Sequence, residues 1–394
     1  MKGRVKLAFA REWRRTWQIS EQRWLLIWLP LILSSMVAAI FYKGKLEALP
    51  IAVVAPDDGP VQRQIIRDLE SLPSVSLLRM ENLGFAEHAI RSNEVYAIVH
   101  FPREFDRSII RKEPATVHLF LNGQLLLVGN TLETDVQQVF SNHSARIQMR
   151  HEWAQGRPTA AAASRVLPVN NQRNPIANPG LDFTPFLAGT AVPCVLQISL
   201  LLGSIWVVGY ELRTATAHRW WKLSRQSRFI ALLSKLTPIS IFGCLWGWLW
   251  LGWLFSPGLP GVLPGCNWPT ESSLFLLGAA WLLFVLATVG LGAGLALLTA
   301  NLRLALSLGA FLSAPAMAFA GITFPHFAMP LPAFLWAQLI PVNHYLQLQE
   351  YIVYKGGIPL PAVIALLIIA LLGWLTATIL VSRRCQDPLS WNKS

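Results

Sequence analysis

Charged residues are scarce in this chain of 394 residues: 14% are charged, whereas 53% are hydrophobic. A soluble globular protein carries roughly 25% charged residues, so nearly half of the usual polar surface is missing. This shortage excludes an ordinary soluble protein and favours a chain that lies largely in a lipid bilayer. The 17 tryptophans and 19 phenylalanines agree with that reading, because aromatic side chains gather at lipid headgroups.

Motifs that hold phosphate, metal or a nucleophile are also missing. The chain has no G-x-x-x-x-G-K-[ST] loop, the usual means of holding ATP phosphates. It has no H-E-x-x-H, C-x-x-C or G-x-S-x-G pattern, and its four cysteines show neither disulfide nor metal spacing. We therefore expect no catalytic residues and no metal or cofactor bound by this chain, and we rank an intramembrane enzyme last among its possible functions.

Apolar stretches are abundant, and six are long enough, or nearly so, to cross a bilayer core of about 30 Å as helices. The stretch near residues 304–320 is the shortest and contains Pro315. No small-residue cleavage site follows the first stretch, so we interpret it as an uncleaved signal anchor. The sequence predicts a membrane all-α fold of six transmembrane helices. Their predicted ranges are 24–42, 184–208, 229–254, 273–298, 304–320 and 358–381.

Lysine and arginine gather on one side of these spans. Seven precede the first span and five lie between the second and the third, whereas residues 256–272 have none. The positive-inside rule then places both termini in the cytoplasm of a multi-pass protein of the bacterial inner membrane, with residues 382–394 as a cytoplasmic tail. Because the basic residues lie beside the spans and leave no soluble basic face, we expect no nucleic-acid partner.

Residues 1–23 predict a cytoplasmic amphipathic helix at the membrane surface. Val5, Phe9, Trp13 and Trp17 recur every four residues and form one apolar stripe, while arginines lie on another face. Such a helix lies in the headgroup plane with its apolar side toward the lipid. The alternative is a segment that serves only as an orientation signal.

Residues 43–183 predict an α/β domain, with its linker, inserted on the periplasmic side between the first span and the five-helix domain of residues 184–381. Four β-rich runs alternate with helical stripes, as in an α/β sheet. About 130 residues suffice for an independent core. The linker is rich in Pro, Asn and Gly. The predicted strands are 51–55, 75–78, 95–99 and 116–121.

The stretch before the last span is apolar but holds Pro325, Pro330, Pro332 and Pro341. Proline interrupts helices, and non-helical backbone at membrane depth survives only where protein or a water-filled cavity covers it. We therefore expect residues 321–345 to form a re-entrant hairpin of two short helices at the outer end of a pathway. The alternative is an ordinary outer loop on the headgroups.

Local motifs resemble those of one family in the same order along the chain. Residues 173–175 read Arg-Asn-Pro before the second span, and residues 210–216 resemble an E-R-E-x-G-T run after it. Lys235 with Pro238 resembles a Lys-x-x-Pro pattern in the third span, and the proline-rich residues 321–345 are the strongest match. These motifs resemble the ABC-2 type transporter permeases, specifically multidrug exporters with a large periplasmic domain after the first span.

The resemblance implies a permease subunit of an ATP-driven exporter, without an ATPase site of its own. ATP and Mg would lie on cytoplasmic ABC ATPase subunits, and a second permease copy or a paralogue would complete the pathway. A periplasmic adaptor and an outer-membrane channel would receive the substrate. The sequence departs from the family at several positions. Leu212 and Arg213 stand where the pattern has Arg and Glu, and Ala215 stands where it has glycine. Gln349-Glu350 occupy the place of an arginine often found after the His-Tyr position.

We expect no charged side chain deep in a span, since the nearest, Lys235, can reach the interface from near a span end. An ion-coupled pump normally keeps a titratable group in the membrane, so we expect energy to come from a partner. A charge-poor pathway favours an amphipathic or lipophilic substrate such as a drug. The rival hypothesis is a non-transporting assembly factor or receptor whose outer domain binds a ligand or partner.

Two sets of residues are predicted to act. The loop after the second span would couple the chain to its ATPase. Its carboxylate would contact the partner, and its two tryptophans would lie at the lipid boundary. The alternative is that its arginines only orient the protein in the membrane. These coupling residues are Glu211, Arg213, Arg219, Trp220, Trp221, Lys222 and Arg225. The predicted outer pathway residues are Phe324, Pro325, Met329, Pro330, Pro341, His344 and Tyr345.

Overall fold

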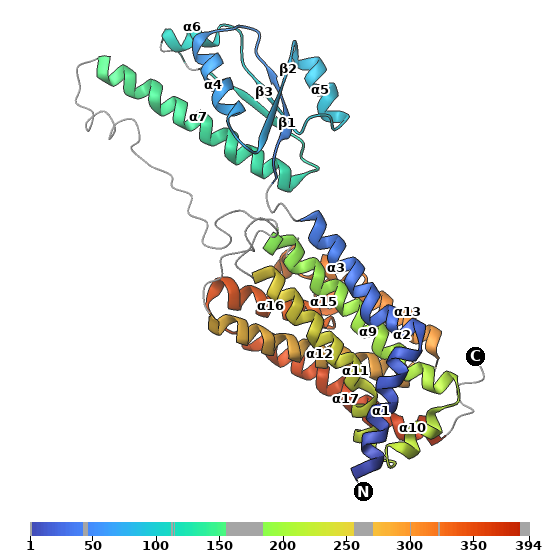
Figure 1. Ribbon diagram of the computed structural model, residues 1–394. Helices are drawn as coiled ribbons and strands as arrows, with labels where there is room; N and C mark the ends of the chain where they lie inside the picture. Colours follow the sequence, from blue (N-terminus) through green and yellow to red (C-terminus); the bar gives the residue numbers. More distant parts are fainter. Residues whose placement is uncertain are drawn as a thin grey trace. The chain divides into compact units, whose positions relative to one another are not determined.

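The computed structural model describes residues 2–41, 46–111, 113, 115–154, 184–255, 271–299, 301–321 and 324–386. The chain divides into two compact units, which we call the membrane unit (residues 1–44 and 175–394) and the smaller unit (residues 45–174). Figure 1 shows the helices and strands of each unit, and each unit has a hydrophobic core of its own. The linker predicted before the second span lies outside the described residues up to residue 183.

Within its described residues, the regular elements of the membrane unit are all helices or helical turns. It begins with α1 (Lys2–Gln18), α2 (Ser20–Arg23), a π-helical turn (Trp24–Trp28) and α3 (Leu29–Ile40). It continues with a second π-helical turn (Thr184–Ala188), α9 (Gly189–Arg213), α10 (Ala217–Leu223), α11 (Arg228–Phe255) and α12 (Glu271–Thr299). It ends with α13 (Leu302–Ser313), α14 (Ala316–Phe319), a short 3-10 turn (His326–Ala328), α15 (Leu331–Gln338), α16 (Pro341–Glu350), a π-helical turn (Tyr351–Lys355) and α17 (Leu360–Gln386).

Five helical segments of the described chain are long and apolar enough to cross a membrane. The predicted fifth span is interrupted, because α13 ends at Ser313 and α14 adds only one turn after Pro315. The 12 residues of α13 extend about 18 Å, which is short of a bilayer core of about 30 Å. A multi-pass helical membrane protein is therefore shown, and the count of six stays a prediction. The five segments are Ser20–Ile40, Phe186–Arg213, Arg228–Leu254, Ser273–Thr299 and Leu360–Gln386.

Prolines inside the spans leave carbonyl groups that neighbouring helices satisfy. Pro30 has no N–H for the carbonyl of Leu26, and the indole N–H of Trp246 donates to that oxygen at 2.8 Å. Pro193 likewise frees the carbonyl four residues before it, which accepts from the side-chain amide of Gln349 at 3.1 Å. Since unsatisfied backbone groups are costly in lipid, these bonds fix the contacts of the first span with α11 and of α9 with α16.

Glycines bring α12 and α17 into close contact. A Cβ atom added to Gly373 of α17 would lie 2.5 Å from the backbone carbon of Gly290 on α12. A Cβ on Gly294, one turn later, would lie 3.1 Å from the carbonyl oxygen of Gly373. Small residues at such a crossing let two helix backbones approach and pack without a strong hydrophobic driving force.

The smaller unit contains a four-stranded sheet of order β2-β1-β3-β4. β1 pairs in parallel with β2 and β3, and β4 runs antiparallel to β3. Each of the four predicted runs contains a strand, and the side of the membrane on which this unit lies stays a prediction. The strands are β1 (Leu49–Val54), β2 (Val75–Met80), β3 (Ala97–His100) and β4 (His118–Leu121), and the helices are α4 (Pro60–Glu70), α5 (Leu83–Arg91), α6 (Phe105–Ile110) and α7 (Leu126–Ala154).

Helices cover both faces of this sheet (Figure 1). Ile51 of β1 faces a core that includes residues of α4 and α7, whereas Ala52 faces a second core with α5. A strand buried on both faces reads as a continuous apolar run, which is how β1 appears in the sequence. His143 of α7 is buried and lies 2.8 Å from the carboxylate of Asp68, so this pair helps to hold α7 against α4.

Candidate functional site

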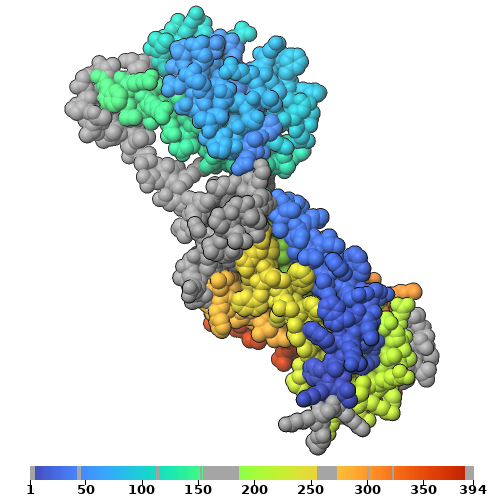
Figure 2. Space-filling model, in the orientation of Figure 1, coloured from blue at the N-terminus to red at the C-terminus, as the bar shows by residue number. Residues whose placement is uncertain are grey.

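Charged side chains from three helices meet at one end of the membrane unit. Figure 1 shows α1 beside α10 and α11 at this end, and in Figure 2 α1 (dark blue) lies next to the yellow-green segment around α10. We call the group the ion cluster. It consists of Arg11, Glu12 and Arg15 from α1, Glu211 from α9 and Lys235 from α11.

Lys235 is the centre of the ion cluster. Its ammonium nitrogen lies 2.5 Å from a carboxylate oxygen of Glu12 and 2.6 Å from one of Glu211. The three side chains are at most 3% exposed to solvent. Burying a single charge in this way costs several kcal/mol, so the three groups are stable here only because each is paired with an opposite charge.

Two arginines complete the environment of Glu211. A guanidinium nitrogen of Arg11 lies 2.9 Å from its carboxylate, and Arg15 and the hydroxyl of Thr216 also donate to it. Arg11 in addition donates to Glu12 at 2.8 Å. Two carboxylates thus face three cations, and the partly exposed arginines connect the buried pairs to the surface.

The position of α1 follows from residues spaced four apart on one face. Ala8, Glu12 and Thr16 are all buried against the rest of the unit. The Thr16 hydroxyl donates to the carbonyl of Glu12, and the amide of Gln22 donates to that hydroxyl, each at 3.0 Å. The small Ala8 side chain allows a close approach, and Glu12 and Thr16 make the rest of this buried face polar.

The predicted apolar stripe lies beside that face. Val5 and Phe9 are half-buried, while Trp13 and Trp17 are 41% and 49% exposed. Their rings lie 5.9 and 6.2 Å from the ring of Phe242 on α11. The stripe therefore contacts α11 on one side and leaves aromatic surface open on the other, as a helix between protein and lipid requires.

The end of α9 turns Thr216 back onto Glu211. The Thr216 N–H donates to the Glu211 carbonyl at 3.0 Å, and the Ala215 N–H donates to the carbonyl of Leu212 at 3.2 Å. This is the pair of bonds that closes many helices, and it requires a left-handed residue, here Ala215 at φ 58°. Glycine adopts this conformation without the strain that a Cβ atom adds, which explains the glycine of the resembling motif.

Two predicted placements around α10 are wrong. Trp220 and Trp221 were expected at the lipid boundary, but they are 1% and 4% exposed and pack inside the protein. The Trp220 indole donates to the carbonyl of Ala231 at 3.0 Å, and its ring lies 5.7 Å from the nitrogen of Lys235. Trp220 thus attaches α10 to α11, and both rings are part of the apolar core of the membrane unit.

Glu211 and Lys235 also differ from expectation. Glu211 lies in the last turn of α9 rather than in an exposed loop, and its full burial excludes it as a contact for another protein. Lys235 was expected to reach the interface, but it is buried and paired because two carboxylates lie next to it. The remaining predicted coupling residues are exposed. These are Arg213, Arg219, Lys222 and Arg225.

Sequence reasoning missed the contribution of α1. Glu12 is the one acidic residue among the first 20, and it lies in a basic helix between Arg11 and Arg15. A lone acid in a basic helix and a lone lysine in an apolar span are complementary anomalies. Matching them would have predicted the contact of Glu12 with Lys235.

The outer hairpin residues divide into two groups. Pro341, His344 and Tyr345 on α16 are buried, whereas the residues before α15 are mostly exposed. The side chain of Gln197 accepts the N–H of Val342 at 2.7 Å and so caps the start of α16. The predicted pathway residues before α15 are Phe324, Pro325 and Pro330, which are exposed, and Met329, which is half-buried.

A model of the ABC-2 family transporter proteins matches residues 22–380. The chain belongs to this family. It is therefore a membrane transport component and not itself the ATPase, and the family implies association with an ABC ATPase and the bilayer. No curated protein matches the chain. The family match covers Glu211 and Lys235 but begins after α1, so the other half of the ion cluster lies outside it.

Proposed function

We propose that this ABC-2 family chain is the permease subunit of an ATP-driven exporter that moves an amphipathic or lipophilic substrate, such as a drug, out of the cytoplasm or inner membrane. The main support for this proposal is that the ion cluster adjoins exposed basic side chains, since Thr216, which donates to Glu211, lies between the exposed Arg213 and Arg219 in the chain. A surface of this kind accepts a partner protein, and the cluster links that surface to the spans.

The basic surface would receive the ATPase. We define it by Arg213, Arg219, Lys222 and Arg225, which are exposed at the end of α9 and around α10. Positive charge speeds and orients the approach of an acidic partner surface. Because this end is the basic one, the positive-inside rule supports its cytoplasmic location, with both termini on the same side.

The ion cluster would transmit movement from this surface. α10 is attached to α11 through Trp220, and α11 is attached to α9 and α1 through Lys235. Displacement of α10 by a partner would therefore move three helices together, since separating them would leave buried charges unpaired. Glu211 acts in this proposal by holding helices together and not by touching the ATPase.

The outer helices would close the other end of the pathway. Gln197, which caps α16, lies near the middle of the 28-residue span Phe186–Arg213. The start of α16 therefore reaches the depth of mid-span, which supports a re-entrant hairpin over an outer loop. A second copy or a paralogue would face this pathway, and the smaller unit would meet an adaptor and an outer-membrane channel in the periplasm.

The test is co-purification with an ABC ATPase encoded beside this chain, followed by ATPase measurement in detergent. Reversing two charges of the basic surface, with Arg219→Glu and Lys222→Glu, should lower stimulated ATPase activity at least about tenfold, since the loss of even one contact to a charged group costs about 1.5–3 kcal/mol and about 1.4 kcal/mol is a factor of ten. The permease itself should melt at an unchanged temperature, because both side chains are exposed.

The matched control is Arg303→Glu, a reversal at an exposed arginine of α13 outside the basic surface. It should leave ATPase activity unchanged. Full stimulation in the double variant would refute the docking surface. Failure of every ATPase to co-purify would favour the rival function, a non-transporting receptor or assembly factor.

A further inference from the structure

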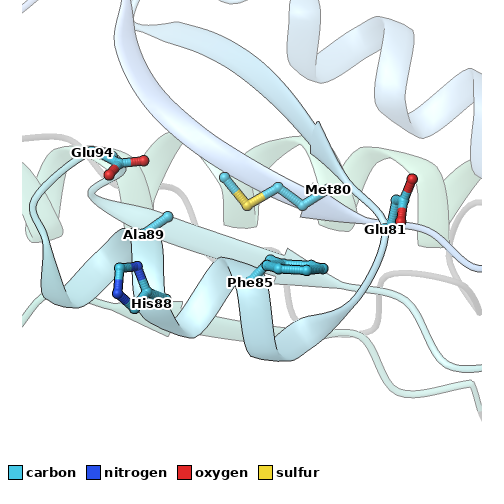
Figure 3. A pocket seen from close by; sticks show the side chains of 6 residues that line it. All are labelled: Met80, Glu81, Phe85, His88, Ala89 and Glu94. Carbon is cyan, nitrogen blue, oxygen red and sulfur yellow. The ribbon is translucent and has the colours of Figure 1, made fainter.

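The smaller unit has a hollow of about 300 Å³ between the end of β2 and α5. β2 stands at one edge of the sheet and pairs only with β1 among the described strands. The proposed transport function uses none of the residues around this hollow. The lining residues are Met80, Glu81, Phe85, His88, Ala89 and Glu94 (Figure 3).

The middle of the hollow is apolar. Ala89 is buried against the sheet, Met80 is half-buried, and the ring of Phe85 is 62% exposed. Figure 3 shows the Met80 side chain above the Phe85 ring. The side-chain oxygen of Asn82 accepts the Phe85 N–H at 3.0 Å, which fixes the start of α5 and hence the position of this ring.

Two carboxylates stand at opposite ends of the hollow, Glu81 at one and Glu94 at the other (Figure 3). Among the described residues no lysine or arginine pairs with either of them, and Glu94 accepts a hydrogen bond from the hydroxyl of Ser92 at 3.0 Å. Glu87, which is on α5 between them in sequence but outside the hollow, pairs with Arg91. The carboxylates of the hollow are thus open to a cation from elsewhere.

The turn after α5 brings Glu94 to its place. Asn93 is left-handed at φ 60°, and the Glu94 N–H donates to the carbonyl of Ala89 at 2.9 Å. The carboxylate then lies at the C-terminal end of α5, where the helix is partly negative and an anion is unfavourable. A stabilising interaction with the helix therefore does not explain why a glutamate occupies position 94. A bound cation would be attracted both by the Glu94 carboxylate and by the negative end of the helix.

We infer that this hollow binds an organic cation with an apolar body, such as a protonated or quaternary aromatic amine. The carboxylates attract the positive charge, the face of Phe85 adds a cation–π contact, and the thioether of Met80 packs against the body. Anionic ligands are excluded because they would meet two carboxylates. A volume of about 300 Å³ is at the lower limit for small-molecule sites, so the ligand is about one ring in size.

Binding is measured on the full chain in nanodiscs of zwitterionic lipid, with empty nanodiscs as reference. The probe is benzyltrimethylammonium, followed by saturation-transfer NMR, and benzyl alcohol is the neutral control with the same ring. The cation should bind and the alcohol should not at the same concentration. Raising KCl to about 0.5 M should weaken binding, because salt screens exposed charges. Equal binding of the alcohol would overturn the inference.

The decisive variant is Glu81→Gln with Glu94→Gln, which should weaken binding of the cation at least about tenfold. Phe85→Leu should weaken it as well, and Phe85→Tyr should preserve it, because only an aromatic ring offers a cation–π contact. Glu87→Gln makes the same chemical change on α5 outside the hollow and should have no effect. Unchanged affinity in the double variant overturns the inference, and equal melting temperatures show that all variants fold.

A second arm separates a free cation from a lysine side chain of a partner protein. The probe is a blocked Lys-Phe dipeptide. If it binds at least about tenfold more tightly than benzyltrimethylammonium and the double variant abolishes this, the hollow is a protein-docking site and the small-molecule assignment fails. These variants leave the ion cluster and the basic surface untouched, so failure here is distinguishable from failure of the proposed export function.

Discussion

Each unit buries an apolar core, but the two differ in where charged and large apolar side chains lie. In the smaller unit Ile51 and Leu132 are fully buried, and Glu81 is exposed. In the membrane unit Glu211 is fully buried, whereas Leu371 of α17 is 66% exposed. Water favours burial of apolar surface, but lipid chains are as apolar as leucine and supply no such force.

This contrast shows which residues determine the packing of each unit. In the smaller unit, the apolar pattern decides which residues pack. In the membrane unit, the same pattern only decides which segments enter the bilayer, and polar groups and glycines decide which helices touch. The bond from Trp246 to the Leu26 carbonyl, the cap of α16 by Gln197 and the crossing at Gly373 are all of this second kind.

The largest effect is expected where the membrane unit buries charge. Lys235→Met leaves Glu12 and Glu211 without their shared ammonium group, and removing one partner of a buried ion pair costs about 3–5 kcal/mol. The melting temperature and folded yield of the detergent-solubilised protein should fall sharply. Arg14→Ala, an exposed position on α1, is the control and should change stability by less than about 0.5 kcal/mol.

Adding Glu12→Gln to Lys235→Met should restore part of the lost stability, because it removes one of the two carboxylates that the first change left without its ammonium partner. A single Lys235→Met protein with wild-type melting would contradict the view that the ion cluster holds the helices together. It would also remove the basis for transmission through α1.

An intermediate effect tests the comparison directly. Leu132→Ala in the smaller unit should destabilise that unit by about 2–5 kcal/mol, since a fully buried leucine is lost. Leu371→Ala on the exposed face of α17 should change stability by less than about 0.5 kcal/mol. The measurement is chemical unfolding of the full chain, with hydrogen exchange to assign each transition to its unit. Equal effects would refute the contrast.

The smallest effect concerns the turn after α9. Ala215→Gly should raise stability by about 1 kcal/mol, because glycine occupies a left-handed position without steric cost. Ala10→Gly, the same change inside α1, should lower stability by about 1 kcal/mol. Opposite signs in thermal melts would support the turn geometry, and a loss of stability in both variants would contradict it.

Much of the fold was predictable from the sequence. Strands formed at the four β-rich runs because alternating or continuous apolar residues are a local signal, and the long apolar helices appeared where expected. The fifth span was the exception. Pro315 lies inside an apolar stretch, and hydrophobicity alone does not show that the helix stops two residues before it.

The candidate site was only half predictable. The basic residues around α10 are exposed as expected, because a run of arginines cannot be buried without partners. Glu211, Trp220 and Trp221 were placed at the surface on the strength of their sequence neighbours. Their burial depends on α1 and α11, which are distant in sequence and approach only in the folded unit.

The sequence by itself determined which segments can enter a bilayer, which side carries the basic residues and which family the chain resembles. These properties depend on the local density of apolar and charged residues, which a single stretch of chain already contains. Only the tertiary structure decided that Glu12, Glu211 and Lys235 meet. A charge is stable inside a protein only when an opposite charge lies within a few ångströms, and that proximity is a property of helix packing rather than of any one segment.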